Sequence, residues 1–407
     1  MNVKVFDLNN KIKVAYMRSQ TEVVHIGLMV GVGSRNDEKQ FLGFSHFVEH
    51  MWFKGTNRRT SMQIINDIEK LGGDFNAYTS KEETCVHISI LKDSFPVALD
   101  VLSDIYYNST FPACELEKER EVIVDEIDSY EDSPSELIFD EFEEYLYKES
   151  SLSYPILGTR ESLSEISSEV MIEQYDQKFL EAKLVVSFVG NVPFEIFEKE
   201  LRNTFLDINV RSMPLIDSGK IHKNDSFNIV RHKKTSQAHC VLGCEAYSWD
   251  SAYRLPLAML STILGGPQFS SILSYSLREK HGLTYNVESV YTPYSDSGSL
   301  SIYFGTEKKK VETCLAIIKE EFKRICNTDL FNNEIEGYKK QLLGQLALSY
   351  ENNLNLMLSH AKSVLVFNKV ESFNVISKKV QSIDASVLKN IANELLQFDK
   401  MSILLYN

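Results

Sequence analysis

Apolar and polar residues alternate along the first half of the chain in a way that predicts a mixture of strands and helices. An apolar run of strand length covers Val23–Val32 and ends at the turn-like Gly33–Asp37. Apolar residues then recur at helical spacing through Met62–Leu71, and Gly72-Gly73 is typical of a helix end. The pattern further predicts strands at Asp74–Thr79, Thr84–Leu91 and Lys183–Val189, and helices at Phe95–Tyr107, Glu115–Tyr130, Leu137–Tyr147 and Val170–Phe179.

The second half repeats this order after a polar, aperiodic stretch at about residues 210–225, which we interpret as a linker. The predicted elements are a strand at Ala238–Cys244, helices at Ala252–Leu264 and Ser270–Lys280, strands at Thr284–Tyr291 and Gly298–Gly305, and a helix at Val311–Ile325. A repeated strand–helix–helix–strand–strand–helix order predicts a duplicated α+β unit. We therefore expect two homologous domains, residues 1–212 and 226–407, each a mostly antiparallel sheet packed with helices.

Composition narrows the class of protein. The 407 residues are 43% hydrophobic and 25% charged, as in ordinary globular proteins, and are enough for two domains. A net charge of −14 without a basic stripe argues against nucleic-acid binding. No apolar run reaches membrane-spanning length, and residues 1–18 lack a signal-peptide core. The six cysteines are scattered without a Cys-x-x-Cys pair, and Cys240 and Cys244 share a face of an apolar, strand-like run, which is typical of core thiols. We therefore expect a cytoplasmic protein.

The most informative motif is His46-Phe47-Val48-Glu49-His50. On a helix, His46 and His50 lie one turn apart on the same face, where both imidazoles can reach one cation. Glu49 lies beside them, close enough to act on a metal-bound water, and the order His-x-x-Glu-His is the inverted zincin signature. The alternative is a core helix with satisfied histidines, but two buried histidines and a glutamate are costly without a cation or partners.

A catalytic zinc usually takes three protein ligands. The acidic segment Glu115–Asp132 offers several candidates for the third one. Glu119 and Glu126 are seven residues apart and share a helix face with Ile123, so we expect these acids to be partly buried. We interpret Glu121, Asp128 and Glu131 as part of a solvated face, and the spacing alone does not choose between Glu119 and Glu126.

Several segments together resemble the pitrilysin and mitochondrial processing peptidase family of inverted-zincin metallopeptidases. The residues that carry this resemblance are Gly43–Thr56, Leu71–Gly73, Asn76–Thr79, Glu117–Glu126, Tyr154–Thr159, Leu264–Gly266 and Leu277–Tyr285. The chain departs from the family at Trp52, where a smaller apolar residue is usual and where we expect the indole to narrow a neighbouring pocket. It departs again at Ile272, where the family often has a basic residue.

The resemblance assigns roles to individual residues. It implies one Zn²⁺ held by His46, His50 and Glu126, with Glu119 as an acid that supports the site. It also implies that Glu49 takes a proton from the attacking water and passes it to the leaving amine. Arg278 and Tyr285 match a pair that orients substrate in the family.

Asn76, Ala77 and Thr79 match a family segment in a predicted strand region, so we expect an extended peptide to add to this sheet edge. The alternative for Asn76-Ala77 is an ordinary turn. The remaining histidines lack partner spacing, and we interpret them as structural or solvated.

The expected activity is zinc-dependent endopeptidase cleavage of extended or unstructured peptides, in precursor processing or peptide degradation. One alternative is a non-catalytic or heterodimeric subunit of a processing-peptidase-like complex, although such members typically lose part of the zinc motif. A metal-dependent lyase of the same broad fold is opposed by the duplicated second half. In the family, zinc-bearing and Arg/Tyr-bearing domains face each other across a chamber. This chain carries both sets, so we expect a homodimer rather than a heterodimer with an inactive paralogue.

Overall fold

The structure is a computed structural model that describes residues 3–8, 12–205 and 225–407. The predicted linker therefore lies outside the described residues, apart from residue 225. The chain forms two compact units, each built from three segments of the sequence. The first unit comprises Met1–Asp128, Tyr154–Asp217 and Leu348–Ser372, and the second comprises Ser129–Ser153, Ser218–Ala347 and Phe373–Asn407.

The first unit contains a six-stranded sheet in the order β1-β2-β6-β3-β5-β4. Its strands are β1 (Lys4–Asp7), β2 (Lys13–Arg18), β3 (Val23–Val30), β4 (Asp74–Thr79), β5 (Thr84–Leu91) and β6 (Leu184–Gly190). Strands β2 and β6 are parallel, whereas the other neighbours are antiparallel. Strand β4 lies at one edge, so one side of its backbone has no neighbouring strand in this sheet.

The second unit contains a five-stranded sheet in the order β7-β11-β8-β10-β9. Its strands are β7 (Asn228–Arg231), β8 (Ala238–Glu245), β9 (Thr284–Pro293), β10 (Gly298–Thr306) and β11 (Ser402–Tyr406). Again one neighbouring pair, β7 and β11, is parallel and the rest are antiparallel. This order reproduces β2-β6-β3-β5-β4 position by position. The predicted α+β duplication is confirmed.

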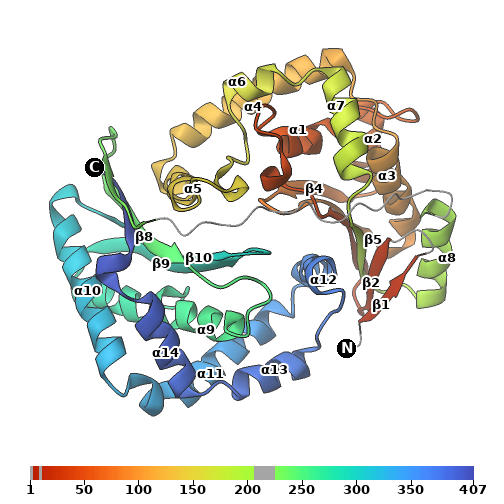
Figure 1. Ribbon diagram of the computed structural model, residues 1–407. Helices are drawn as coiled ribbons and strands as arrows, with labels where there is room; N and C mark the ends of the chain where they lie inside the picture. The colour runs from red at the N-terminus through yellow and green to blue at the C-terminus, as the bar shows by residue number, and fades with distance from the viewer. Residues whose placement is uncertain (1–2, 9–11, 206–224) are drawn as a thin grey trace. The chain divides into compact units, whose positions relative to one another are not determined.

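Helices account for most of the remaining structure (Figure 1). Those of the first unit are α1 (Phe44–Met51), α2 (Ser61–Glu69), α3 (Phe95–Tyr107), α4 (Ala113–Glu131), α6 (Arg160–Ser164), α7 (Ser168–Gln174), α8 (Phe194–Phe205) and α12 (Asn353–Phe367). Those of the second are α5 (Pro134–Leu146), α9 (Arg254–Gly265), α10 (Val311–Asn327), α11 (Leu330–Ser349), α13 (Phe373–Gln381) and α14 (Ala385–Leu395). Two predicted helices include a π-helical turn, at Tyr175–Phe179 and Ser274–Lys280.

Helices cover both faces of each sheet. On one face, the helix comes from the other half of the sequence. In the first unit α3 packs on β3 and β5, while α12, drawn in blue in Figure 1, packs on β2, β3 and β6. Met29 and Val185 face α12 residues such as Ala361 and Val364, whereas their neighbours along the strands face the main core. In the second unit α5 packs in the same way on β8 and β11. The compact units therefore differ from the contiguous ranges 1–212 and 226–407 by this exchange of one helix each.

Two further expectations concern the membrane and the cysteines. None of the helices in the described parts of the chain combines the length and the apolar character that a bilayer crossing requires. All six cysteines are free thiols, and Cys85, Cys240 and Cys314 are buried. Cys240 agrees with the prediction of a core thiol, Cys244 is half-buried, and Cys114 is exposed.

Candidate metal centre

Helix α1 holds both histidines of the motif on one side. Its Phe44, Phe47 and Val48 side chains are fully buried in the core of the first unit. The imidazoles of His46 and His50 lie next to each other, with ring centroids 4.6 Å apart. Helix α1 is therefore a core helix, as expected if its histidines were only structural. It also presents two candidate metal ligands side by side.

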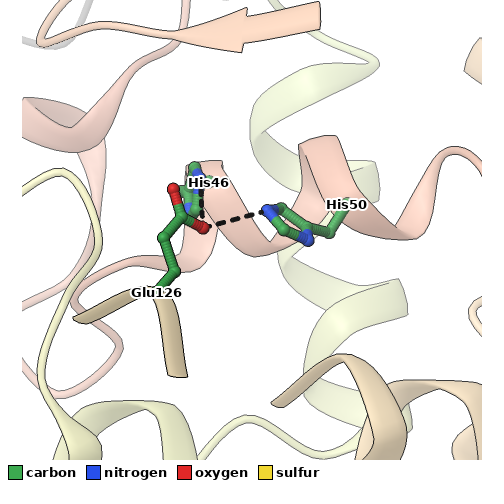
Figure 2. A group of neighbouring side chains, drawn as sticks. All are labelled: His46, His50 and Glu126. Carbon is green, nitrogen blue, oxygen red and sulfur yellow. Dashed lines mark ion pairs between the residues drawn. The ribbon is translucent and has the colours of Figure 1, made fainter. Parts of the chain in front are cut away.

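Glu126 of α4 brings a carboxylate to these histidines (Figure 2). Its Oε2 lies 3.7 Å from His46 Nε2 and 3.5 Å from His50 Nε2. Among the described residues, these three are the one group of histidine, cysteine and acidic side chains whose ligand atoms gather within 4.8 Å of one another. Tetrahedral zinc with bonds of about 2.0–2.1 Å needs ligand atoms roughly 3.3–3.4 Å apart. Two imidazole nitrogens and a carboxylate oxygen at these distances fit zinc, and the donor set leaves a fourth position for water.

The two acids, both expected to be partly buried, differ in their exposure to solvent. Helix α4 buries Leu116, Glu119, Ile123 and Ile127, a stripe at i, i+3, i+4 spacing. Glu126 lies at the edge of this stripe, and 44% of its side chain is exposed. Glu126 is therefore more exposed than the partial burial expected for it, because a position one residue before Ile127 turns towards solvent.

Glu119 contacts the second ring nitrogen of His50, Nδ1. Its Oε2 lies 3.1 Å from His50 Nδ1, which leaves Nε2 of the same ring directed at Glu126. Such a carboxylate–histidine contact fixes the tautomer and orientation of a metal ligand. The structure therefore places Glu119 beside the ligands and outside the group of three, where the resemblance put it.

The two imidazoles differ in protonation. Burial and the neighbouring His50 lower the pKa of His46 to about 4, so its ring is neutral at pH 7. Burial also lowers the pKa of His50, but hydrogen bonds to Glu119 and Glu126 outweigh it and raise this pKa to about 9. His50 must therefore release a proton when it binds a cation.

Glu49 lies on α1 without joining the three ligands. Its Oε2 accepts a hydrogen bond of 2.6 Å from the Thr79 hydroxyl on β4. Burial raises the pKa of Glu49 above that of an ordinary glutamate, although Thr79 and the charge of His50 act in the opposite direction. A carboxylate with a raised pKa, fixed beside a metal site, suits a general base.

An upstream aspartate that the sequence analysis did not identify anchors the start of α1. Asp37 is buried and accepts hydrogen bonds from the backbone N–H groups of Gly43 and Ser45, at 3.0 and 3.2 Å, and from the Ser45 hydroxyl at 2.6 Å. Burial raises its pKa to about 7, while the Ser45 hydroxyl and the charge of Lys178 lower it. Gly43 has φ of 86°, and a Cβ there would lie 2.5 Å from the Leu157 carbonyl oxygen. The segment Tyr154–Thr159 therefore packs against the start of α1 so closely that Gly43 has no room for a side chain.

We expect Asp37→Ala to lower the free energy of unfolding of the metal-free protein by about 2–4 kcal/mol. The substitution leaves two N–H groups at the start of α1 without an acceptor, and each buried unsatisfied donor costs about 1–3 kcal/mol. Chemical denaturation followed by circular dichroism measures the change. Asp7→Ala removes the exposed pair with Lys13 and is the control, with an expected change below about 1 kcal/mol. Equal effects of the two substitutions would contradict the anchoring role.

The predicted substrate-binding residues of the first unit lie on edge strand β4. Asn76, Ala77 and Thr79 are all in the strand, so the alternative of an ordinary turn is wrong. Asn76 is exposed, and its side-chain oxygen accepts a hydrogen bond of 2.8 Å from the Ala77 N–H. Thr79 contacts Glu49, which ties the edge strand to the candidate base.

Arg278 and Tyr285 belong to the second unit. Arg278 lies in the π-helical turn Ser274–Lys280, and its guanidinium stacks 4.7 Å from the centroid of the Phe269 ring. Tyr285 is the second residue of edge strand β9, and 85% of it is exposed. Both side chains are accessible, as a pair that contacts a substrate must be.

The expectation for Trp52 is wrong. Its side chain is fully buried and its indole N–H donates a hydrogen bond of 3.0 Å to the Tyr175 hydroxyl. The ring also packs edge-on against Phe179. Trp52 therefore fills the core behind α1 instead of narrowing a pocket. Ile272 is likewise buried, which accounts for an apolar residue at that position.

Comparison with known proteins agrees with the fold and with a zinc protease. Residues 13–160 match the model of the insulinase family, peptidase family M16, and residues 165–342 match that of the peptidase M16 inactive domain. The uncharacterized zinc protease YmxG of Bacillus subtilis is 31% identical over 98% of this chain and 96% of its own length. An uncharacterized zinc protease of Rickettsia bellii is 32% identical over 97% of this chain and 95% of its own length.

Two solved structures share the whole fold. A protease from Helicobacter pylori superposes with a TM-score of 0.88 at 17% identity, over 100% of this chain and 99% of that one. A peptidase M16 inactive domain from Pseudomonas fluorescens superposes with a TM-score of 0.90 at 20% identity, over 100% and 98%. The chain belongs to peptidase family M16, so the resemblance noted from the sequence is confirmed.

Proposed function

We propose that this chain is a zinc-dependent endopeptidase that cleaves extended or unstructured peptides and holds one zinc ion per chain. The observation that carries this proposal is the arrangement on α1 and α4. Ligand atoms of His46, His50 and Glu126 converge there. Glu49 lies beside them, and its carboxylate accepts a hydrogen bond from Thr79. The zinc-protease names of the relatives agree with it.

Each residue of the site has a separate task in this proposal. A zinc ion held by His46, His50 and Glu126 supplies Lewis-acid chemistry, which polarises a carbonyl and lowers the pKa of water. Glu49 accepts the proton of the attacking water and returns it to the leaving amine. Glu119 keeps Nδ1 of His50 occupied, so that Nε2 offers its lone pair to the metal.

Edge strand β4 supports the proposed substrate class. An extended peptide that pairs with the free side of β4 would use backbone hydrogen bonds, which impose conformation but little sequence selectivity. Because Thr79 of the same strand contacts Glu49, a peptide in this position lies near the candidate base. We include Asn76, Ala77 and Thr79 in the proposed substrate site, together with Arg278 and Tyr285 of the second unit.

The purified protein should contain one equivalent of zinc and cleave short unstructured peptides. Metal analysis and a panel of fluorogenic peptides measure the two properties. Treatment with a chelator should abolish cleavage, and stoichiometric zinc should restore it, because in this proposal zinc lowers the pKa of the attacking water. Zinc-free protein with near-normal activity would refute the proposal, and stable zinc without cleavage of any peptide would favour the non-catalytic subunit.

We further propose that the active form is a homodimer in which each site combines zinc from one chain with Arg278 and Tyr285 of the other. Both residue sets are present in this chain, so no different partner is needed to supply either. A two-fold dimer would contain two equivalent sites.

A further inference from the structure

Lys54 follows the metal-binding helix and has no part in the chemistry described above. Its backbone N–H donates to the Met51 carbonyl in the turn that ends α1, which fixes the start of its side chain. The ammonium group lies 2.5 Å from Oε1 of Glu119, and a quarter of the Lys54 side chain is exposed. Lys54 and His50 therefore hold the two oxygens of one carboxylate.

We propose that Lys54 is a positioning residue for the metal centre: it fixes the Glu119 carboxylate so that Glu119 orients His50 for zinc. The inference rests on the proposed zinc site and adds a residue to it. Lys54 touches neither a ligand nor the reacting atoms in this assignment, and acts through Glu119.

The burial of Glu119 explains why a second partner is needed. Only 8% of its side chain is exposed, so water replaces a lost contact poorly. Oε2 contacts His50 Nδ1 at 3.1 Å, and Oε1 contacts Lys54. A buried carboxylate with one oxygen unpartnered carries a large desolvation cost, which it can relieve by rotating towards water or another donor. Such a rotation weakens the contact that holds His50.

The charge of Lys54 by itself has the opposite effect on zinc affinity from the positioning role. A cation near a metal site repels the metal, so removal of its charge alone should tighten zinc binding. Loss of the Lys54 contact to Glu119 should instead weaken zinc binding. The sign of the change in zinc affinity therefore distinguishes positioning from charge.

The test is the zinc affinity of Lys54→Met, measured by competition with a chromophoric chelator and independent of activity. We expect the dissociation constant to rise about 10- to 100-fold, the range typical of lost outer contacts to metal ligands. Lys54→Arg, which keeps a cationic donor, should recover most of the affinity. Lys118→Met is the matched control on α4: its ammonium pairs with Glu115 and is largely exposed, so the change should stay below about fivefold.

A double mutant shows whether Lys54 acts through Glu119. In a Glu119→Gln background, Lys54→Met should change zinc affinity by less than about threefold, because the contact that it supports is already altered. Melting of the metal-free proteins identifies general destabilisation. If Lys54→Met melts well below wild type, Lys54→Gln replaces it and must show the same direction of change.

Failure of this inference is separable from failure of the proposed function. If wild type binds zinc and Lys54→Met binds it equally or more tightly, the positioning role is wrong and the zinc site stands. The same holds if Lys54→Met weakens binding equally with and without Glu119. If wild type binds no zinc, the proposed function falls together with the inference.

Discussion

Glu49→Gln should retain zinc and lose about 10²- to 10⁴-fold or more in kcat/KM, because the substitution removes a proton acceptor and leaves the ligands in place. The amide has nearly the shape of the carboxylate, and its oxygen can still accept the hydrogen bond from Thr79. Cleavage of a fluorogenic unstructured peptide and metal analysis of the same preparation measure the two properties together.

Glu126→Gln is the matched comparison, since it makes the same chemical change at a proposed ligand. It should weaken zinc retention, because an amide oxygen is a poorer zinc ligand than a carboxylate. Activity should then depend on added zinc, whereas excess zinc should not rescue Glu49→Gln. If Glu49→Gln released zinc while Glu126→Gln kept it, the roles of ligand and base would be reversed.

The pH profile gives an independent view of Glu49. Its protonated form cannot accept a proton, so kcat/KM should fall as pH drops through the pKa of Glu49. Burial raises this pKa, which places the acid limb above the range of an ordinary glutamate. The Thr79 hydrogen bond lowers the same pKa, so Thr79→Val should move the limb to higher pH. An acid limb that Thr79→Val leaves in place would assign it to a different group.

Features set by local sequence were predicted well. The spacing of His46 and His50 fixes their position on one helical face, whatever the rest of the chain does. Strands β4 and β5 have the predicted bounds, because apolar alternation and flanking turn residues act over a few positions. The duplicated order of elements followed from the same local signals, and the two sheets share it strand by strand.

Features that depend on distant contacts were not predicted. Asp37 holds the start of α1 from outside the usual capping position, and Lys54 meets a glutamate on another helix. No spacing rule relates such residues, because they are brought together only by packing. The exchange of α5 and α12 between units was missed for the same reason. Periodicity shows that a helix has an apolar face, but not which sheet covers it.

The proposed homodimer can be separated from two rivals by its dependence on chain pairing. In a heterodimer with an inactive paralogue, the purified chain alone would be inactive at every concentration. In a self-sufficient chain, Arg278 and Tyr285 would serve the zinc of their own molecule. Only in the homodimer do defects in the zinc half and in the Arg278–Tyr285 half compensate each other across two chains.

Mixing two inactive variants should therefore restore activity. A Glu49→Gln chain and an Arg278→Ala, Tyr285→Phe chain should each be nearly inactive alone, since every site in either dimer lacks one component. After co-refolding at equal amounts with random pairing, half of the dimers are mixed and each has one complete site, so activity should return to roughly a quarter of wild type. Mixed dimers can be isolated with two affinity tags, which relates the recovered activity to their number. Isolated mixed dimers without activity would mean that Arg278 and Tyr285 act within their own chain or have no part in cleavage.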